Sequence, residues 1–320
     1  GGHRFYTKSA EILRLWDEIL GEDLLKVRRL SRICYDGKFY KYPLSAFDTL
    51  HNLGLIESAL MVASYVRAKI WPIREEKTFE QWVTNRFGGR LYRTFFETYT
   101  EKVWGMPGHA VQADWAVQRI GTLSMSGAIR KALLGVNGAR TLADEFLYPS
   151  HGSGMMWERL RAKIEAAGGL VETDSEVVRV NHDGRRVTGI VTRSGSRMTE
   201  AVGEHFVSTM PIADLIVALS PPAPDAVLRA ARGLRHRAFV LVGLILGRTD
   251  MFPDNWIYIH TPGVATARIQ NFRNWSAHMA GGAPRTPLGV EYFCNEGDSL
   301  WTTDDKTLIA MAAGELERVA

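Results

Sequence analysis

Apolar residues recur every three to four positions over the first third of the chain, the period of amphipathic helices. From residue 46 to about residue 130 the pattern is helical, and Leu53–Ile70 is a long apolar stretch with few charges. Thr78 and Gln81 have the spacing of a capping box, and Gly88-Gly89 interrupts the pattern. An earlier helix, with Ser9 as its cap, is predicted from the spacing of Ile12, Leu13, Trp16, Ile19 and Leu20.

Alternation of apolar and polar residues predicts strands on both sides of this helical region. Before it, Leu30–Tyr35 and Lys38–Tyr42 flank Asp36-Gly37, a strong hairpin signal. After it, a turn-rich connector over 147–154 leads to a helix predicted over Met155–Ala167. Further strands are predicted over 171–180, 187–192, 205–209, 239–246, 256–259, 268–272 and 289–293, of which 239–246 reads as a buried strand.

The order of these elements predicts a mixed α/β fold with an interrupted domain. The composition changes near residue 148 and again near residue 212, as expected where one domain is inserted into another. The chain begins Gly1-Gly2-His3 without an initiator Met and stops at Ala320 inside an apparent helix. Both ends therefore look like cuts in a longer protein.

Composition and charge narrow the class of protein. The chain has 320 residues, 46% hydrophobic and 23% charged, with a net charge of +4. Its basic residues are spread along the chain, which argues against nucleic-acid binding. The longest apolar run, Ala238–Leu246, is too short for a transmembrane segment. Cys34 and Cys294 lie far apart and no signal peptide is visible, so we expect free thiols and a cytoplasmic protein.

Several common chemistries have no support in the sequence. Gly152-Ser153-Gly154 resembles the start of a dinucleotide-binding motif, but Trp157 stands where a third glycine must let the helix pack on its strand. The motif is therefore rejected. There is no P-loop, no G-x-S-x-G sequence and no Cys/His spacing of a metal site.

Several collinear segments together resemble the FAD-dependent amine-oxidase superfamily, in the branch with protoporphyrinogen-oxidase-like enzymes and UDP-galactopyranose mutase. Gly1-Gly2-His3-Arg4-Phe5 resembles the glycine pair after the family's nucleotide-binding unit. Tyr99-Thr100-Glu101-Lys102-Val103-Trp104-Gly105 resembles its Y-T-x-K-x-W-G segment. Tyr148-Pro149 with Gly152, the strand pair 176–180 and 187–190, and Val207–Pro211 follow in the family's order.

The resemblance implies FAD as cofactor and a discontinuous, Rossmann-like FAD-binding domain, truncated here, with an inserted helical and β-sheet substrate domain. We assign residues 1–45 and 148–212 to the FAD-binding domain, and 46–147 and 213–320 to the substrate or cap domain. The family's G-x-G-x-x-G strand is expected before Gly1 and its last flavin-contacting helix after Ala320, so these residues alone should bind FAD poorly. By resemblance, the cofactor contacts fall on Gly1, Gly2, His3, Arg4, Val177, Thr209 and Pro211.

The substrate is less well defined than the cofactor. Amine-oxidising relatives usually carry a lysine near the flavin, where this chain has Leu241, and no lysine occurs between Lys163 and Lys306. Cations beside aromatic residues suit an anionic or sugar-nucleotide ligand, so the substrate candidates are Tyr99, Lys102, Trp104, Arg268 and Arg273. Arg268 and Gln270 should share one face of a strand and Ile269 the other.

Three functions remain open at this point. The first is a flavin oxidoreductase that moves a hydride from a substrate carbon to flavin N5. The second is a sugar-nucleotide mutase that uses reduced flavin, although the Gly152–Trp157 loop lacks the tyrosine of the mutase pattern. The third is a non-catalytic module that contacts a membrane surface or a partner. The basic pI and the apolar Leu53–Ile70 segment suggest this hypothesis. Burial in the core is the competing expectation for that segment.

Overall fold

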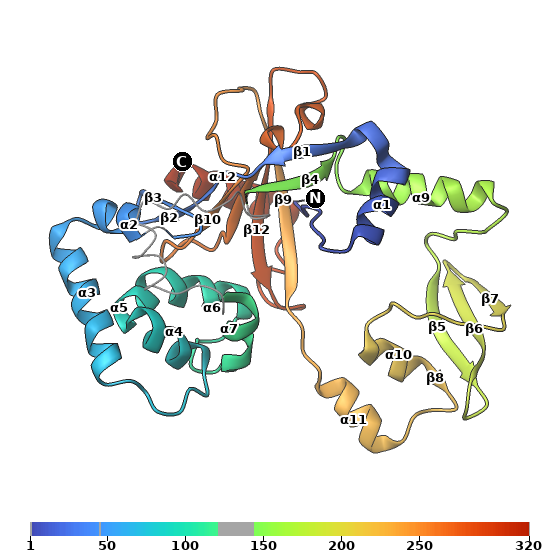
Figure 1. Cartoon of the computed structure of the whole chain (residues 1–320). Coiled ribbons are helices and arrows are strands. Elements are labelled where there is room, and N and C mark those ends of the chain that lie inside the picture. Colours follow the sequence, from blue (N-terminus) through green and yellow to red (C-terminus); the bar gives the residue numbers. More distant parts are fainter. Residues whose placement is uncertain (1, 45, 121–143, 320) are drawn as a thin grey trace. The chain divides into compact units, whose positions relative to one another are not determined.

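The computed structural model describes residues 2–44, 46–120 and 144–319 (Figure 1). These residues form two compact units, one made of residues 1–160 and 237–320 and the other of residues 161–236. Their limits differ from the predicted domain ranges, whose roles stay a prediction. Gly1 lies outside the described residues, as does the predicted helical continuation from 121 to 130.

The larger unit is built on a six-stranded sheet in the order β3-β2-β10-β11-β12-β9. All neighbours are antiparallel except β2 and β10, which run parallel and bring residues 31–34 beside residues 256–259. The predicted Asp36-Gly37 hairpin is confirmed, with both residues at positive φ. The strands are β2 Ser31–Tyr35, β3 Lys38–Lys41, β9 Ala238–Leu246, β10 Trp256–Ile259, β11 Arg268–Asn271 and β12 Thr286–Cys294.

Helix α12 (Asp305–Val319) covers one face of this sheet. Its residues Leu308, Ala312, Leu316 and Val319 pack on aliphatic side chains of the strands. These side chains come from alternate positions: Ile257, Ile259, Ile269, Leu288, Val290 and Val242. We call this the α12 face. Strand β9 was expected to be buried, but it lies at the sheet edge and only one of its two sides packs on α12, so Phe239, Leu241 and Ile245 are exposed.

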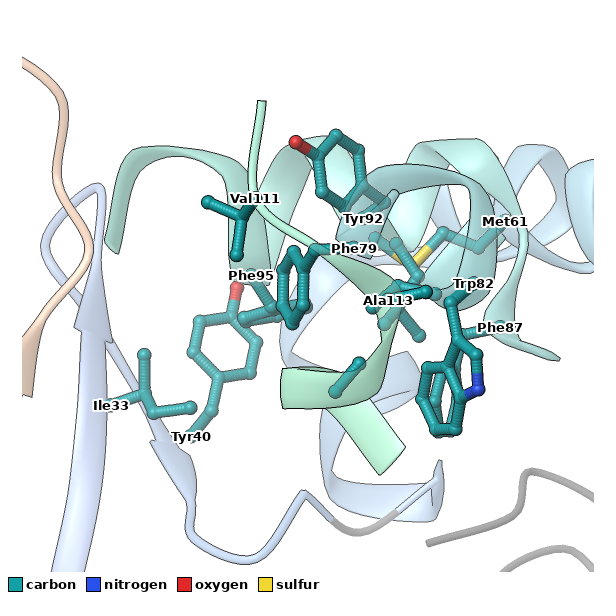
Figure 2. Close-up of a cluster of buried hydrophobic side chains, with 13 residues drawn as sticks. Ile33, Tyr40, Met61, Phe79, Trp82, Phe87, Tyr92, Phe95, Val111 and Ala113 are labelled. Atoms are coloured by element: carbon teal, nitrogen blue, oxygen red, sulfur yellow. The ribbon is translucent and has the colours of Figure 1, made fainter. Parts of the chain in front are cut away.

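The helical region forms a second layer of the larger unit. Its capping box is present as predicted: Gln81 N donates to Thr78 Oγ1 (3.3 Å), and Thr78 N donates to Gln81 Oε1 (3.1 Å). Aromatic residues fill its core, which reaches the sheet at Ile33 and Tyr40 (Figure 2). The elements are α2 Ala46–Leu53, α3 Leu55–Ile70, α4 Phe79–Phe87, α5 Gly89–Tyr92, the π-helical η2 Arg93–Glu97, α6 Thr98–Trp104 and α7 Ala113–Ile120.

Helix α3 departs from the expectation of core burial. It packs on α4 and α5 through one side only, and most of its apolar residues on the other side are exposed. Within the described residues no helix is long and apolar enough to cross a membrane.

A two-stranded ribbon joins the early and middle parts of the chain in the larger unit. Strands β1 (Leu24–Arg28) and β4 (Glu145–Pro149) pair antiparallel, although 147–154 was predicted to be a connector. The sequence prediction missed strand β4 because Pro149 and the turn residues after it made the whole segment look like a connector. Helix α1 (Ala10–Leu20) precedes the ribbon and α9 (Gly154–Ala166) follows it; short 3-10 turns are η1 Gly21–Asp23, η3 Phe272–Asn274 and η4 Ala277–Ala280.

The smaller unit holds a four-stranded sheet in the order β7-β6-β5-β8. Strands β5 (Glu176–His182) and β6 (Val187–Ser194) match the predicted pair in part, but 171–175 is not strand. The strand predicted over 205–209 is also absent, and β7 (Arg197–Val202) was missed because its side chains are exposed and show no apolar alternation. The remaining elements are α10 Ile212–Ala218, β8 Leu219–Ser220 and α11 Asp225–Gly233.

Candidate functional site

The second face of the six-stranded sheet differs in composition from the α12 face. Strand register places Ile33, Tyr258, Arg268, Glu291 and Leu241 in one row across five strands. The adjacent row contains Ser31, Trp256, Gln270, Gly289 and Gly243. We call this polar and aromatic side the site face. The prediction that Arg268 and Gln270 share a face, with Ile269 on the other, is confirmed.

A buried ion pair lies at the centre of the site face. Arg268 donates two hydrogen bonds to Glu291, from Nε to Oε2 (2.6 Å) and from Nη2 to Oε1 (2.8 Å). The Gln270 side-chain amide also donates to Glu291 Oε1. Burial alone would lower the pKa of Arg268, but the Glu291 carboxylate holds that pKa above its usual value. The guanidinium therefore stays charged within the site.

The N-terminal segment passes close over this face. A Cβ on Gly2 would overlap the Gln270 side-chain amide, so any other residue at this position would require that amide to move. The Arg4 guanidinium lies over the Trp256 ring, 5.7 Å from its centroid. His3 and Arg4 are exposed. The structure thus brings two predicted cofactor residues, Gly2 and Arg4, to the face that carries Arg268, and the exposed His3 lies between them in the chain.

Tyrosines form a wall beside the ion pair. The Tyr258 ring lies 4.9 Å from the Tyr42 ring and 5.5 Å from the Tyr99 ring. Burial raises the pKa of Tyr42 to about 12 and also raises the pKa of Tyr99, so both phenols stay protonated at neutral pH. Arg29 donates to the Tyr42 carbonyl (3.2 Å), and burial and the nearby Arg4 charge lower the pKa of Arg29. The wall offers neutral hydroxyl donors and guanidinium groups.

Helix α6 positions Tyr99 through contacts on its sheet-facing side. Tyr99 stacks on His260 with ring centroids 4.6 Å apart. Burial, with a contribution from the Lys102 charge, lowers the pKa of His260 to about 3, so this ring is neutral. One turn after Tyr99, Lys102 Nζ donates to the carbonyls of Ile259 (2.8 Å), Thr261 (3.2 Å) and Thr266 (3.1 Å). These bonds use all three donors of the ammonium group.

The other predicted substrate residues lie elsewhere. Trp104 packs edge-on against Trp115 beside the helical core, with centroids 5.1 Å apart. Arg273 donates to the carbonyls of Ala283 (3.5 Å) and Arg285 (3.2 Å). Of the five substrate candidates, Tyr99 and Arg268 therefore lie together. Lys102 and Arg273 bind main-chain carbonyls, and Trp104 packs on an aromatic neighbour. Their roles in substrate binding stay predictions.

Three predicted cofactor residues belong to the smaller unit. Val177 is half-buried in β5, next to an irregularity in its pairing with β6. Thr209 and Pro211 are exposed, and Pro211 directly precedes α10. Their part in cofactor binding stays a prediction.

Some residues of the site face were not identified in the sequence. Glu291 is an isolated carboxylate in the apolar segment 288–294 of β12, and that isolation was the available signal. Tyr42 follows the hairpin, far in sequence from Tyr258, so only the parallel pairing of β2 with β10 explains their contact. The described residues hold no cluster of His, Cys, Asp or Glu that could bind a metal.

Comparison with known proteins identifies the fold. No family model matches the sequence. A reduced UDP-galactopyranose mutase has a TM-score of 0.83 and 16% identity, covering 100% of this chain and 68% of the mutase chain. A protoporphyrinogen oxidase-like protein from Exiguobacterium sp. 255-15 has a TM-score of 0.69 and 16% identity, covering 100% and 71%. A putrescine oxidase has a TM-score of 0.56 and 15% identity, covering 100% and 70%. The chain therefore has the fold shared by these members of the FAD-dependent amine-oxidase superfamily.

Proposed function

We propose that the protein is a FAD-dependent oxidoreductase that acts on a small anionic substrate at the site face. The observation that carries this proposal is the site face itself, with the buried Arg268–Glu291 pair under the Gly2–Arg4 segment. The fold shared with flavoenzymes supports it. In this proposal residues 1–45 and 148–212 serve the cofactor, and 46–147 and 213–320 serve the substrate.

The residues present fit a flavin nucleotide. A Cβ on Gly2 would overlap Gln270, so the main chain lies close to the site face at this position. The buried Gln270 Oε1 has no hydrogen-bond partner among the described residues, and a ring N–H of a bound ligand would satisfy this acceptor if Gly2, which covers it, moved aside. Arg4 supplies a cation suited to a phosphate group. We propose Gly1, Gly2, His3, Arg4, Val177, Thr209 and Pro211 as the residues that would hold FAD.

The bound flavin would supply a hydride acceptor, and the chain's own residues would bind and orient the substrate. Arg268 stays charged and would bind a carboxylate or phosphate oxygen through the part of its guanidinium not used by Glu291. The protonated Tyr42 and Tyr99 hydroxyls would donate hydrogen bonds to the same ligand. Leu241 lies opposite Glu291, where amine-oxidising relatives are expected to carry lysine, so an amine is not the proposed substrate.

A mutase acting on a sugar nucleotide is the second candidate. The TM-score of 0.83 against UDP-galactopyranose mutase, compared with 0.56 against putrescine oxidase, favours it. The guanidinium groups of Arg4, Arg29 and Arg268 near the tyrosine wall also suit a diphosphate. This reaction would require the flavin in its reduced state and no net oxidation of substrate.

The test uses the natural protein that carries this sequence. Its flavin content is measured by absorbance. The oxidised protein is then mixed with candidate acids without oxygen, and the reduced protein is mixed with UDP-galactose without oxygen. Substrate-dependent flavin reduction supports the oxidoreductase, and isomerisation without net oxidation supports the mutase. A Gly2→Leu variant should lose flavin by at least about tenfold, because the added side chain overlaps Gln270.

The control is Gly314→Ala, since a Cβ at that helical position meets no atom within 4 Å. Its flavin content should equal that of the parent. Purification of the natural protein without flavin, and no uptake of added FAD, would overturn the proposal.

A further inference from the structure

Helix α3 and the loop after it present a continuous apolar surface to solvent. The exposed fractions are 91% for Leu55, 78% for Ile56, 59% for Ile70 and 71% for Trp71. Between these ends an open groove of about 630 Å³ runs along the helix over Ala59, Val62, Ala63 and Val66. We call this surface, from Leu55 to Arg74, the α3 surface. It belongs to the helical layer, and neither the site face nor the proposed reaction uses it.

The opposite side of α3 is firmly held, so the exposure is not the result of a detached helix. Arg90 N donates to Ser64 Oγ (3.0 Å), and the Arg90 guanidinium pairs with Glu57 (2.7 Å). Gly88 packs against the main chain at Tyr65, where a Cβ would come within 2.8 Å. Met61 and Ala68 are buried on the same side. The apolar outward side is therefore a fixed feature of the fold.

The loop that displays Trp71 is also fixed. The buried side chain of Asn85 donates from Nδ2 to the Ile73 carbonyl (2.8 Å) and accepts at Oδ1 from the Ile73 amide (2.8 Å). Asn85 is itself held by Glu76 Oε1 (2.9 Å). A side chain projected by such a loop loses little conformational freedom when it binds. Trp71 is thus displayed ready for contact.

The charged side chains around the α3 surface that have no partner of opposite charge among the described residues are positive. Arg67 and Arg74 are exposed, and neither has a carboxylate partner among the described residues. The nearby carboxylates Glu57, Glu75 and Glu76 are each paired with a cation, namely Arg90, Lys77 and Arg86. The unpaired charge at the C-terminal end of the surface is therefore positive, which favours an anionic partner.

We infer that the α3 surface binds the anionic headgroup and acyl boundary of a lipid bilayer. An in-plane helix with an apolar face, a terminal tryptophan and flanking cations has the chemistry of interfacial attachment. A bilayer also needs no complementary shape, whereas a single helix about 24 Å long offers little area for a stable dimer.

The test is co-sedimentation of the natural protein with vesicles. One set contains phosphatidylcholine alone and the other contains phosphatidylcholine with about a quarter phosphatidylglycerol. The protein should sediment with the anionic vesicles, and Trp71→Ser should weaken that binding about tenfold. Arg67→Gln and Arg74→Gln should each weaken it about fivefold, while binding to neutral vesicles stays unchanged.

A matched control comes from another exposed apolar residue. Val207 is 92% exposed and lies in the smaller unit, so Val207→Ser should bind anionic vesicles as the parent does. The inference is overturned by equal losses in Val207→Ser and Trp71→Ser, or by no binding to anionic vesicles. It is also overturned if sedimentation velocity shows dimers of the parent that Trp71→Ser dissociates, since a second copy would then occupy the surface.

Discussion

The two faces of the six-stranded sheet are made from alternate residues of the same strands, yet their side chains make different contacts. On the α12 face, Ile269 and Val290 pack on a helix and make no polar contact through their side chains. On the site face, their chain neighbours Arg268 and Glu291 form a buried ion pair. Aliphatic packing stabilises the fold but does not orient a ligand. An intact buried ion pair contributes little net free energy to stability, whereas removing one partner costs much more because the other charge is left buried and unpaired. The difference separates residues that stabilise the sheet from residues that we propose for ligand binding.

The largest expected effect comes from breaking the ion pair. Glu291→Gln leaves the partly buried Arg268 guanidinium without its carboxylate, so the free energy of unfolding should fall by about 4 kcal/mol. Denaturant unfolding measures it. The double variant Arg268→Met, Glu291→Leu should recover most of the loss, because no buried charge remains. A double variant as unstable as the sum of the single variants would contradict this account of the site face.

The next effect concerns the α12 face. Leu288→Ala should lower the free energy of unfolding by about 3 kcal/mol, because Leu288 is fully buried and the truncation leaves a cavity. Unlike Glu291→Gln, it should leave flavin content and ligand binding unchanged in the folded protein. Equal loss of ligand affinity in both variants would remove the functional distinction between the faces.

The smallest effect depends on pH and involves His260, which follows β10 on the site face. Its pKa is about 3 in the folded protein and about 6.5 when unfolded, so below about pH 6.5 the unfolded state binds more protons. This group should make the protein about 2 kcal/mol less stable at about pH 5 than at about pH 7. His260→Phe should remove that dependence and keep the ring against Tyr99, as unfolding curves at both pH values would measure.

The control for this prediction is His205→Phe, because His205 is exposed in the smaller unit. Its loss of stability on acidification should match that of the parent. If His260→Phe loses as much stability on acidification as the parent does, the pH dependence does not come from His260.

Local signals predicted much of this fold. The Asp36-Gly37 turn and the Thr78/Gln81 capping box depend on residues close in sequence, and both were predicted correctly. The alternation around Ile269 gave the two faces of β11. Alternation cannot give the neighbour of a strand, so the parallel pairing of β2 with β10 was not predicted. Burial of α3 was wrong because apolar composition does not reveal which side packs.

The same limit applies to the site. Tyr99 and Arg268 could be selected by residue type, but their proximity depends on helix α6 meeting the sheet. Lys102 was selected for the same reason, and only the structure shows its ammonium bound to three carbonyls. The sequence shows which side chains can donate hydrogen bonds, but only the fold determines which acceptors they meet.

The three bonds of Lys102 have a consequence for chemical modification. Acylation of this amine would remove its charge and leave it with one N–H donor instead of three. The loop between β10 and β11 would then lose its tie to α6, and the Tyr99 ring would lose its fixed distance from the sheet. Burial lowers the pKa of Lys102 to about 8, which enlarges its fraction of reactive free amine above neutral pH. Lys102 is therefore both the tie between α6 and the β10–β11 loop and a point of sensitivity to electrophiles.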